Sequence, residues 1–570
     1  MRSSFALVLI ATILSGIRAI AQTSAAAPDP SVPTLKVNTR LTLIDVTATD
    51  SKQRPVHGLT KPDFTLKEDN KPQPIKNFEE FGADIPAEQA PPLPPDVYSN
   101  GPASQRTTRA VNILLFDQVS TGISYGLQPN PEGLKYAKEA SLEYLKTMPA
   151  GTQVAVLQMD GEGLHEVQGL TSDQSQLLAA VNSIVYRPAD QSRWELSAAD
   201  FRAPTLPLLC RAMNFQSEQA LNGLNQAALS VSGIPGRKNL MWFTPGIPWL
   251  TDYPRFSQFP IIGCTNDYTR QLQEVYGRLT AARVALYPID PRGALIVQMD
   301  DPERHAPQGL GDISAKFGIA AYTDNVSLDD MAKATGGKPH YSNNELAGLL
   351  RDDAATGSDY YALSYVPPLS KYDGKYHKID VKVHRPGVQL EYRRGYTSLD
   401  LNGPALETTK AHGKPAAPKN TFHTAMSYGS PVATQLVFAV RALPSTGPQS
   451  SPVIGSLNAE LKNKPLIRYS FAFDLPRNKI TLEQQPDGSR KASFELAIAA
   501  YDVQGRVLNS LDEKRSVTLK PGAVAAFLQK PFVVPVEIDL PPGSLSVRVG
   551  IQDLQSEQVG VVDIPLAVGK

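Results

Sequence analysis

The side chains best suited to bind a ligand or a metal ion lie at the end of a predicted buried strand. The run "NILLFDQVST", residues 112–121, passes from β-branched and apolar residues to Asp117 and then to the hydroxyls of Ser120 and Thr121. Carboxylate and hydroxyl oxygens are the ligands that hard divalent cations take, so this loop is a candidate metal site. The alternative is structural, because an aspartate at such a position can cap the following turn by accepting backbone N–H bonds.

No arrangement of side chains in the sequence indicates an enzyme. No HExxH pair, G-x-S-x-G elbow, phosphate loop or dinucleotide fingerprint follows a predicted strand. We therefore expect no catalysis, and a hydrolase of envelope polymers is the alternative from another class. The eight histidines are spread over several segments, and each is interpreted as a surface or turn residue: His57, His165, His305, His340, His377, His384, His412 and His423.

The two cysteines and one tryptophan bear on stability and binding. Cys210 and Cys264 are the only cysteines, and they lack the CxxC spacing of metal and redox motifs. In an exported protein they can form one disulfide, which we expect, with two buried thiols as the alternative. In "WFTPGIPWL", Trp242 and Phe243 fit a sheet core, whereas Trp249 is a candidate contact residue on a binding surface.

The first residues predict export. One arginine, the apolar stretch "FALVLIATILSGI" and "AIA" at residues 19–21 have the layout of a secretory signal peptide that is cleaved after Ala21, with an uncleaved anchor as the alternative. No later segment approaches the roughly 20 apolar residues of a spanning helix, so we expect a secreted or periplasmic protein. Lysine plus arginine equals aspartate plus glutamate at 56 each. The chain therefore has no excess positive charge that would attract nucleic acid.

Strands and helices alternate over residues 109–357. "AVNILLF", "QVAVLQM", "KNLMWF" and "VALYPI" are continuous apolar runs of the kind found in parallel strands covered on both faces. Helical periodicity separates them, so the pattern predicts an α/β fold with a doubly wound, mostly parallel sheet. Two loop-like insertions, residues 187–215 and 247–268, interrupt the pattern, and we expect a partner surface there because such loops form the rim of the sheet.

Composition divides the rest of the chain into short β units and linkers. Alternating polar and apolar residues indicate strands, and proline-rich stretches without a period indicate linkers. We expect the C-terminal part to be an immunoglobulin-like β-sandwich. The expected parts are a signal peptide (1–21), a flexible leader (22–33), a small β unit (34–81), a Pro-rich linker (82–108), the α/β domain (109–357), accessory β strands (358–398), a linker (399–425) and the sandwich (426–570).

Several phrases of the sequence resemble one known family. A strand that ends in Asp117, followed by "GRKNLMWFTPG", "LYPIDPRG" and "MAKATGGKPHY", looks like a von Willebrand factor type A domain, which has a Rossmann-like fold. Upstream "LTLIDVTATDSKQRPVHGLTKPDFTLKEDNKPQPI" and downstream "YYALSYVPP", "YDGKYHKIDVKV" and "YRRGY" are similar to the VWFA-related family of secreted acidobacterial proteins. The resemblance covers roughly residues 35–398 and excludes the C-terminal part.

The resemblance implies a metal-ion-dependent adhesion site, from which this chain departs. The family pattern is an Asp-x-Ser-x-Ser loop, a threonine from a second loop and a Thr-Asp-Gly turn. Here Val119 takes the middle hydroxyl position, Thr121 matches the last, and Ser120 lies beside it. The turn has become Thr244, Pro245 and Gly246, which removes the second carboxylate. One carboxylate and two hydroxyls hold Mg2+ weakly, so we expect a degenerate, empty site, with weakly bound Mg2+ or Mn2+ as the alternative.

These observations predict an exported, non-enzymatic protein-binding or adhesion module without a cofactor. Its partner is expected to be another protein, with no nucleic acid and no integral membrane segment after signal cleavage. Thr244 and Trp249 are the candidate binding residues at the rim of the sheet. The main alternative is a metal-dependent adhesin of the same fold, which would need a divalent ion to bind its target.

Overall fold

The computed structural model shows a mixed α/β protein. The chain divides into two units, Met1–Arg40 and Leu41–Lys570, and every described residue lies in the second. The predicted signal peptide, the leader and most of the second linker therefore lie outside the described part. No helix in the described part is long and apolar enough to cross a membrane. The structure describes residues 41–82, 88–89, 93–101, 104–106, 110–121, 123–124, 128–129, 132–187, 206–247, 268–293, 328–368, 372–399, 421–445, 453–475, 480–529 and 532–569.

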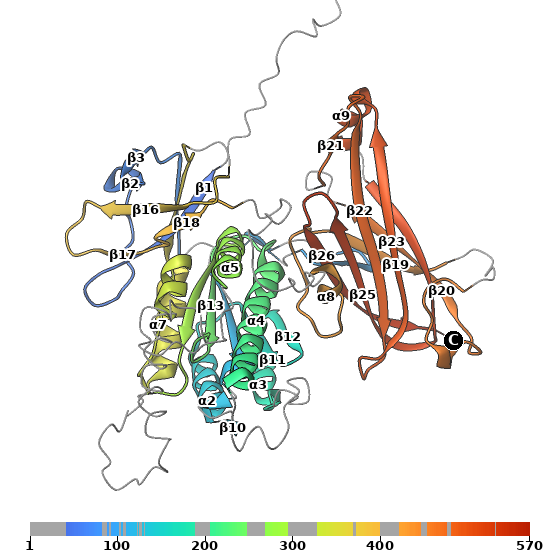
Figure 1. The fold of residues 1–570 in the computed structure, drawn as a ribbon, viewed down its shortest axis with the longest axis horizontal. Coiled ribbons are helices and arrows are strands. Elements are labelled where there is room, and N and C mark those ends of the chain that lie inside the picture. The colour runs from blue at the N-terminus through green and yellow to red at the C-terminus, as the bar shows by residue number, and fades with distance from the viewer. Residues whose placement is uncertain are drawn as a thin grey trace, which may run out of the picture. The chain divides into compact units, whose positions relative to one another are not determined.

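The α/β domain is built on a five-stranded sheet with the order β12-β11-β8-β13-β14 (Figure 1). Strand β12 is antiparallel to β11, and the other four strands run parallel. Numbered along the chain, this order is 3-2-1-4-5, the arrangement of a doubly wound sheet, which confirms the predicted mostly parallel sheet. The strands are β8 (Val111–Asp117), β11 (Val154–Asp160), β12 (Gly163–Thr171), β13 (Lys238–Phe243) and β14 (Val284–Ile289).

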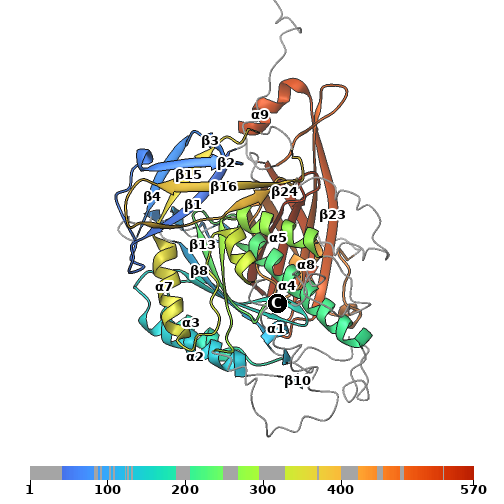
Figure 2. The same cartoon turned by 60° about the vertical axis from the view of Figure 1, so that its left-hand side comes forward.

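Helices cover both faces of this sheet, which is why its central strands are continuous apolar runs (Figure 2). Successive side chains of β8 point to opposite faces. Ile113 and Leu115 pack with α4 and α5, while Leu114 and Phe116 pack with α2, α3 and α7. The helices are α2 (Glu132–Thr147), α3 (Gln174–Ser183), α4 (Leu206–Val231), α5 (Thr269–Ala281) and α7 (Leu346–Ser358).

Strands from before and after the α/β domain form one β unit with a shared core. Local patterns indicate two separate parts, residues 34–81 and 358–398, whereas β1 pairs with β15 and β2 pairs with β16. Figure 1 shows the blue strands β2 and β3 near the yellow strand β16. The sheets are β17-β1-β15-β4 and β18-β16-β2-β3. Their strands are β1 (Thr42–Thr49), β2 (Phe64–Glu68), β3 (Lys71–Gln73), β4 (Asn77–Phe81), β15 (Tyr360–Tyr365), β16 (Tyr376–Val383), β17 (Gln389–Glu391) and β18 (Gly395–Thr397).

The C-terminal part contains two antiparallel sheets that share one hydrophobic core. One sheet has the order β24-β20-β19-β6, and the other has β21-β22-β25-β26 with β23 beside β22. The immunoglobulin-like assignment stays a prediction. The strands are β6 (Val97–Ser99), β19 (Ala439–Pro444), β20 (Ile467–Leu475), β21 (Glu483–Gln484), β22 (Arg490–Tyr501), β23 (Val507–Leu519), β24 (Phe532–Leu540), β25 (Gly543–Asp553) and β26 (Val559–Val568).

Strand β6 belongs to the predicted Pro-rich linker, residues 82–108, yet it pairs with β19 at the edge of the C-terminal sheet. Asn100 fixes this arrangement, because its Nδ2 donates to the carbonyl oxygens of Ala433 at 2.8 Å and Leu436 at 2.9 Å. Its Oδ1 accepts from the backbone N–H of Phe438 at 2.9 Å. The segment between the β unit and the α/β domain is therefore partly integrated into the C-terminal fold.

Lys238, the first residue of β13, places its amine in the protein interior. Lys238 is 1% exposed, and its Nζ donates to the carbonyl oxygen of Ile234 at 2.8 Å. Burial, with Arg283 nearby, lowers the pKa of Lys238 to about 7. We expect Lys238→Met to raise the free energy of unfolding at pH 7 by about 1 to 2 kcal/mol, because a methionine fills the site without a charge to desolvate.

Urea unfolding at pH 7 and pH 9 measures this effect. The pKa is lower in the folded protein, so the unfolded chain binds more protons between pH 7 and 10 and the wild type gains stability as the pH rises. The advantage of Lys238→Met should therefore shrink at pH 9. Lys135→Met, on an exposed lysine of α2, is the control and should change little. A destabilised Lys238→Met would mean that the bond to Ile234 outweighs the cost of burial.

Candidate functional site

The candidate site lies where the strand order of the parallel sheet reverses, between β8 and β13. Ligands of doubly wound sheets bind outside the carboxyl ends of the strands at this point. Phe116 of β8 is opposite Phe243 of β13, so the next residues, Asp117 and Thr244, leave the sheet side by side. The Thr244 hydroxyl donates to Asp117 Oδ2 at 3.1 Å. The sheet therefore brings together two residues that the sequence predicts for the site.

Asp117 is an interior residue whose carboxyl oxygens both accept hydrogen bonds from the protein. It is 1% exposed, and its Oδ1 accepts from the backbone N–H of Ser120 at 2.9 Å. Burial raises the pKa of Asp117 to about 6, although the bonds from Ser120 and Thr244 act in the opposite direction. The bond to the Ser120 amide is the turn cap that the structural interpretation predicts.

The remaining residues of the predicted metal loop are turned inward or lie outside the described part. Val119 is 1% exposed and belongs to the core beneath α4. Ser120 is buried, and its Oγ lies near the Asp117 carboxyl without a hydrogen bond of regular geometry. Thr121 ends the short helix α1 (Gln118–Thr121), and its side chain is outside the described residues.

Of the two predicted binding residues, the structure describes Thr244 but not Trp249. Thr244 is fully buried, so it does not face a partner; its hydroxyl holds Asp117 and accepts from the Gly246 amide at 3.2 Å. The expected contact role of Thr244 is therefore corrected to a structural one. Trp249, Cys264 and the side chain of Cys210 lie outside the described residues, so the contact role and the disulfide stay predictions. Trp242 and Phe243 are fully buried in the two cores of the sheet.

Two further aspartates at the same edge are absent from the sequence-based site. Asp160 ends β11 and Asp290 follows β14, and each is 2% exposed. Arg292 holds Asp290 through Nε to Oδ1 at 2.9 Å and Nη2 to Oδ2 at 2.7 Å. The same Nη2 also reaches the carbonyl oxygen of Pro245 at 3.4 Å. The signal is readable in the sequence, because "VAVLQMD" and "ALYPID" end like "NILLFD", in an aspartate after a buried run.

Asp160 is neutralised by different partners. His165 Nε2 lies 3.0 Å from its Oδ1, the Glu162 amide donates to the same oxygen at 2.9 Å, and Arg187 Nη1 lies 3.8 Å from Oδ2. Burial alone would raise the pKa of Asp160, but the hydrogen bond and charge of His165 hold it below the usual value. This carboxylate is therefore compensated within the protein.

The described residues at this edge do not fit a bound divalent cation. Mg2+ takes about six oxygen ligands in near-octahedral geometry and loses its water reluctantly. Asp117 already accepts from Ser120 and Thr244, and the neighbouring carboxylate Asp290 is engaged by Arg292. The guanidinium of Arg292 also reaches the carbonyl oxygen of Pro245, in the turn that follows β13. A cation at this edge would therefore meet the positive charge of Arg292.

Comparison with known proteins gives distant structural neighbours only. No family model matches the chain, and no curated protein matches it. Similar solved structures include a von Willebrand factor type A protein from Catenulispora acidiphila, at 13% identity over 64% of this chain and 75% of that chain, with a TM-score of 0.23. The manganese-loaded TRAP protein of Plasmodium vivax is similar at 12% identity over 53% and 96%, with a TM-score of 0.20.

The type V pili tip protein Mfa5 from Porphyromonas gingivalis, solved as three N-terminal domains, is similar at 11% identity over 80% of this chain and 96% of that chain, with a TM-score of 0.24. Von Willebrand factor type A domains are thus among the structural neighbours of this chain. At these TM-scores the similarity supports no argument about the site, and the fold assignment depends on strand order and direction.

Proposed function

We propose that this protein is an exported, non-enzymatic module that binds another protein, and that its α/β domain does so without a metal ion. The observation that carries the proposal concerns the switch point, the place between β8 and β13 where the strand order reverses. There the protein's own hydrogen-bond donors occupy the groups that would bind an ion. Both oxygens of Asp117 are taken by protein donors, and Arg292 lies at the turn that would supply a second carboxylate. The resemblance to the VWFA-related family of secreted proteins supports export and a binding role with a degenerate adhesion site.

The binding surface in this proposal is made by the loops around the closed site. Of the predicted insertion at residues 187–215, residues 206–215 belong to helix α4, and residues 188–205 lie outside the described part. Arg187, before that segment, and Gln216, on α4 after it, both bond to the turn after β8. Arg187 donates its backbone N–H to Gln118 Oε1 at 2.8 Å, and Gln216 Nε2 donates to the carbonyl oxygen of Val119 at 3.2 Å. Asp117 and its partners thus act as the fixed base from which the loop departs. A rim of loops with aromatic anchors can bind a protein without an ion.

Titration of Mg2+ and Mn2+ into the metal-stripped mature protein tests the metal-free part of the proposal. We expect no heat that depends on Asp117. A dissociation constant below about 1 mM, roughly −4 kcal/mol, that is lost in Asp117→Ala would establish the metal-dependent adhesin instead. Heat that survives Asp117→Ala belongs to a site elsewhere in the chain and leaves this proposal intact.

The binding part is tested on a partner that is cross-linked to the rim and then purified. We expect its affinity to be the same in EDTA and in Mg2+, and to fall at least tenfold, about 1.4 kcal/mol, in Trp249→Ala. Tyr372→Ala, on an exposed tyrosine of the β unit, is the matched control and should leave the affinity unchanged. Loss of binding in EDTA, or product from a panel of ester and peptide substrates, would refute a metal-free, non-enzymatic module.

A further inference from the structure

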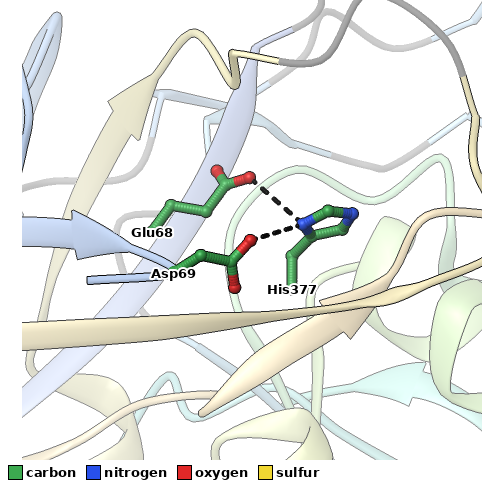
Figure 3. A group of neighbouring side chains, drawn as sticks. All are labelled: Glu68, Asp69 and His377. Atoms are coloured by element: carbon green, nitrogen blue, oxygen red, sulfur yellow. Dashed lines mark hydrogen bonds and ion pairs between the residues drawn. The ribbon is translucent and has the colours of Figure 1, made fainter. Parts of the chain in front are cut away.

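A second cluster of polar side chains lies in the β unit, far along the chain from Asp117. Glu68 ends β2, Asp69 begins the turn to β3, and His377 is near the start of the antiparallel strand β16 (Figure 3). The turn is fixed by the left-handed backbone of Asp69 and Asn70, at φ 49 and 64. Asp69 Oδ1 also accepts from the backbone N–H of Lys378 at 2.9 Å. The backbone therefore fixes two carboxylates and one imidazole around a common point.

The separations within the cluster suit a small tetrahedral cation. His377 Nδ1 makes a hydrogen bond with Asp69 Oδ2 at 2.8 Å, which a metal would replace, and lies 3.7 Å from Glu68 Oε1. Zn2+ binds nitrogen and oxygen at about 2.0 to 2.2 Å, so its tetrahedral ligand atoms stand about 3.3 to 3.5 Å apart. The observed separations bracket this value. Small movements of the Asp69 side chain, which is 47% exposed, would bring the three ligand atoms to that spacing.

An unpartnered buried oxygen points independently to a ligand. Glu68 is 1% exposed, and its Oε2 is buried without a hydrogen-bond partner, while its Oε1 accepts from the Tyr396 hydroxyl at 3.2 Å. The hydroxyl of Tyr365 is nearby, and it too lacks a partner of regular geometry. A buried carboxylate oxygen without a donor is costly. The Glu68 atom that faces His377 is Oε1, so a cation would remove that cost only if both oxygens of Glu68 bind it.

The imidazole has the outer partner typical of metal-bound histidine. His377 Nε2 lies 3.1 Å from Asp373 Oδ1, so Asp373 can accept the Nε2 hydrogen and leave the Nδ1 lone pair for a metal. Carboxylate–histidine–metal arrangements of this kind orient the ring and raise its basicity. The ligand set of one imidazole and two carboxylates favours Zn2+ over Mg2+ and Ca2+, which prefer oxygen alone.

We propose that Glu68, Asp69 and His377 form a Zn2+ site, with water in the remaining position and Asp373 as the residue that positions the histidine. The partial exposure of Asp69 gives the ion access from solvent. The ion would clamp the turn after β2 onto β16, and so join strands that precede the α/β domain to strands that follow it. This role goes beyond the proposed partner binding and does not depend on Asp117.

Calorimetry with Zn2+ alone, on the metal-stripped mature chain, tests the site. We expect one ion per chain with a dissociation constant below about 10 µM, and a raised unfolding temperature, because the ion binds only the folded state. His377→Gln and Asp69→Asn should each weaken binding at least tenfold, and Asp373→Asn by about 10- to 100-fold, as for other outer partners of metal-bound histidine. Co2+ in place of Zn2+ should give the visible absorption of a tetrahedral site.

Three control variants test whether Zn2+ binds at this cluster and not elsewhere in the described part of the chain. His384→Gln changes an exposed histidine of the same β unit. His423→Gln tests the other described group of potential ligands, His423, Glu495 and Asp512, which is mostly exposed. Asp117→Ala separates this site from the switch point. All three should bind Zn2+ like the wild type.

Two results would overturn the proposal. One is the absence of saturable Zn2+ binding by the folded wild type, which would leave a protonated His377 held between carboxylates. The other is binding that persists in both His377→Gln and Asp69→Asn. Asp69 is half exposed, so Asp69→Asn keeps the test valid if His377→Gln fails to fold, as circular dichroism would show.

Discussion

The Asp45→Ala variant is expected to lose about 3 to 5 kcal/mol of free energy of unfolding, because it leaves an arginine that is largely shielded from water without its carboxylate. Asp45 lies on β1, and Arg283 lies in the turn between α5 and β14. Arg283 Nη2 contacts Asp45 Oδ1 at 2.6 Å, and Nε donates to Oδ2 at 3.1 Å. The two side chains are 23% and 9% exposed, so water screens the pair little. The guanidinium also lies near the rings of Phe81 and Tyr360, at 5.9 and 5.7 Å.

The charge of Asp45 supports more than one cation. Arg237 and Lys238 are both buried nearby; burial acts to lower the pKa of each, and the charge of Asp45 acts in the opposite direction. Arg237 donates to neutral acceptors, the Tyr287 hydroxyl at 3.0 Å and the Gly336 carbonyl at 2.8 Å. Removal of Asp45 therefore leaves three interior cations with less compensation. That is why the expected loss exceeds that of an ordinary surface ion pair.

Urea unfolding of both single variants and the double variant measures the coupling. Asp45→Ala and Arg283→Met should each be strongly destabilised, and the double variant should recover part of the loss, because no charge stays unpaired. Arg54→Ala is the control: its partner Asp50 is at the surface and Arg54 is 71% exposed, so its loss should stay below about 1 kcal/mol. Equal losses for Asp45→Ala and Arg54→Ala would contradict the buried-pair explanation.

The central sheet could be predicted because each of its strands and helices has a pattern that is visible in a short stretch of sequence. Each buried strand is a continuous apolar run, and each helix between two strands has its own periodicity. The shortage of metal ligands at the candidate site could also be predicted, since Val119 and Pro245 have no side-chain oxygen. Asp160 and Asp290 were equally visible at the ends of such runs but stand outside the family pattern. Arg292 could not be linked to Asp290 and Pro245 without coordinates.

Pairing between distant strands could not be predicted, because nothing local specifies a partner. Ile44 of β1 is opposite Leu363 of β15, although the whole α/β domain separates them in sequence. Strand β6 is short and follows prolines, and only its partner β19 makes it a strand, which is a tertiary effect that overrides local propensity.

The proposed zinc ligands could not be predicted as a group for a related reason, although one local signal is present in the sequence. Glu68 and His377 come from segments that appear unrelated in the sequence, so no ligand spacing could indicate them. The alternation of β16 does carry information, because His377 is in phase with the buried residues Ile379 and Val381. A histidine on the inward face of a strand needs a polar partner, which an interpretation of it as a surface residue overlooks.

The second large effect is expected at the switch point, where Asp117→Asn should raise the free energy of unfolding at pH 7 by about 1 to 3 kcal/mol. Burial raises the pKa of Asp117 from 3.8 to about 6, and each pKa unit corresponds to about 1.4 kcal/mol. Asparagine has the same shape and no charge. Its amide oxygen can accept from the Ser120 amide, and its amide nitrogen can donate to the Thr244 hydroxyl. That hydroxyl can then donate to the Gly246 carbonyl, 3.4 Å away.

The pH dependence has a definite sign. The folded protein binds a proton at Asp117 more tightly than the unfolded chain does, so the wild type loses stability as the pH rises from about 4 to 6. Asp117→Asn lacks this group, and its advantage should be small at pH 4 and complete above pH 7. Asp173→Asn is the control. Asp173 caps α3 and its pKa is lowered by the Ser175 and Gln176 bonds, so its substitution should not stabilise the protein.

The same unfolding curves recorded with and without Mg2+ distinguish the two interpretations of Asp117. A cation that binds only the folded protein adds RT ln(1 + [L]/Kd), about 1.4 kcal/mol at 10 mM Mg2+ and a dissociation constant of 1 mM. If Mg2+ changes the free energy of unfolding of neither protein, and Asp117→Asn is the more stable of the two, then ionised Asp117 destabilises the fold and binds no ion. If Mg2+ stabilises the wild type alone, the ion compensates the buried charge. The raised pKa would then be a property of the metal-free state, and the loops would depend on the ion for their support.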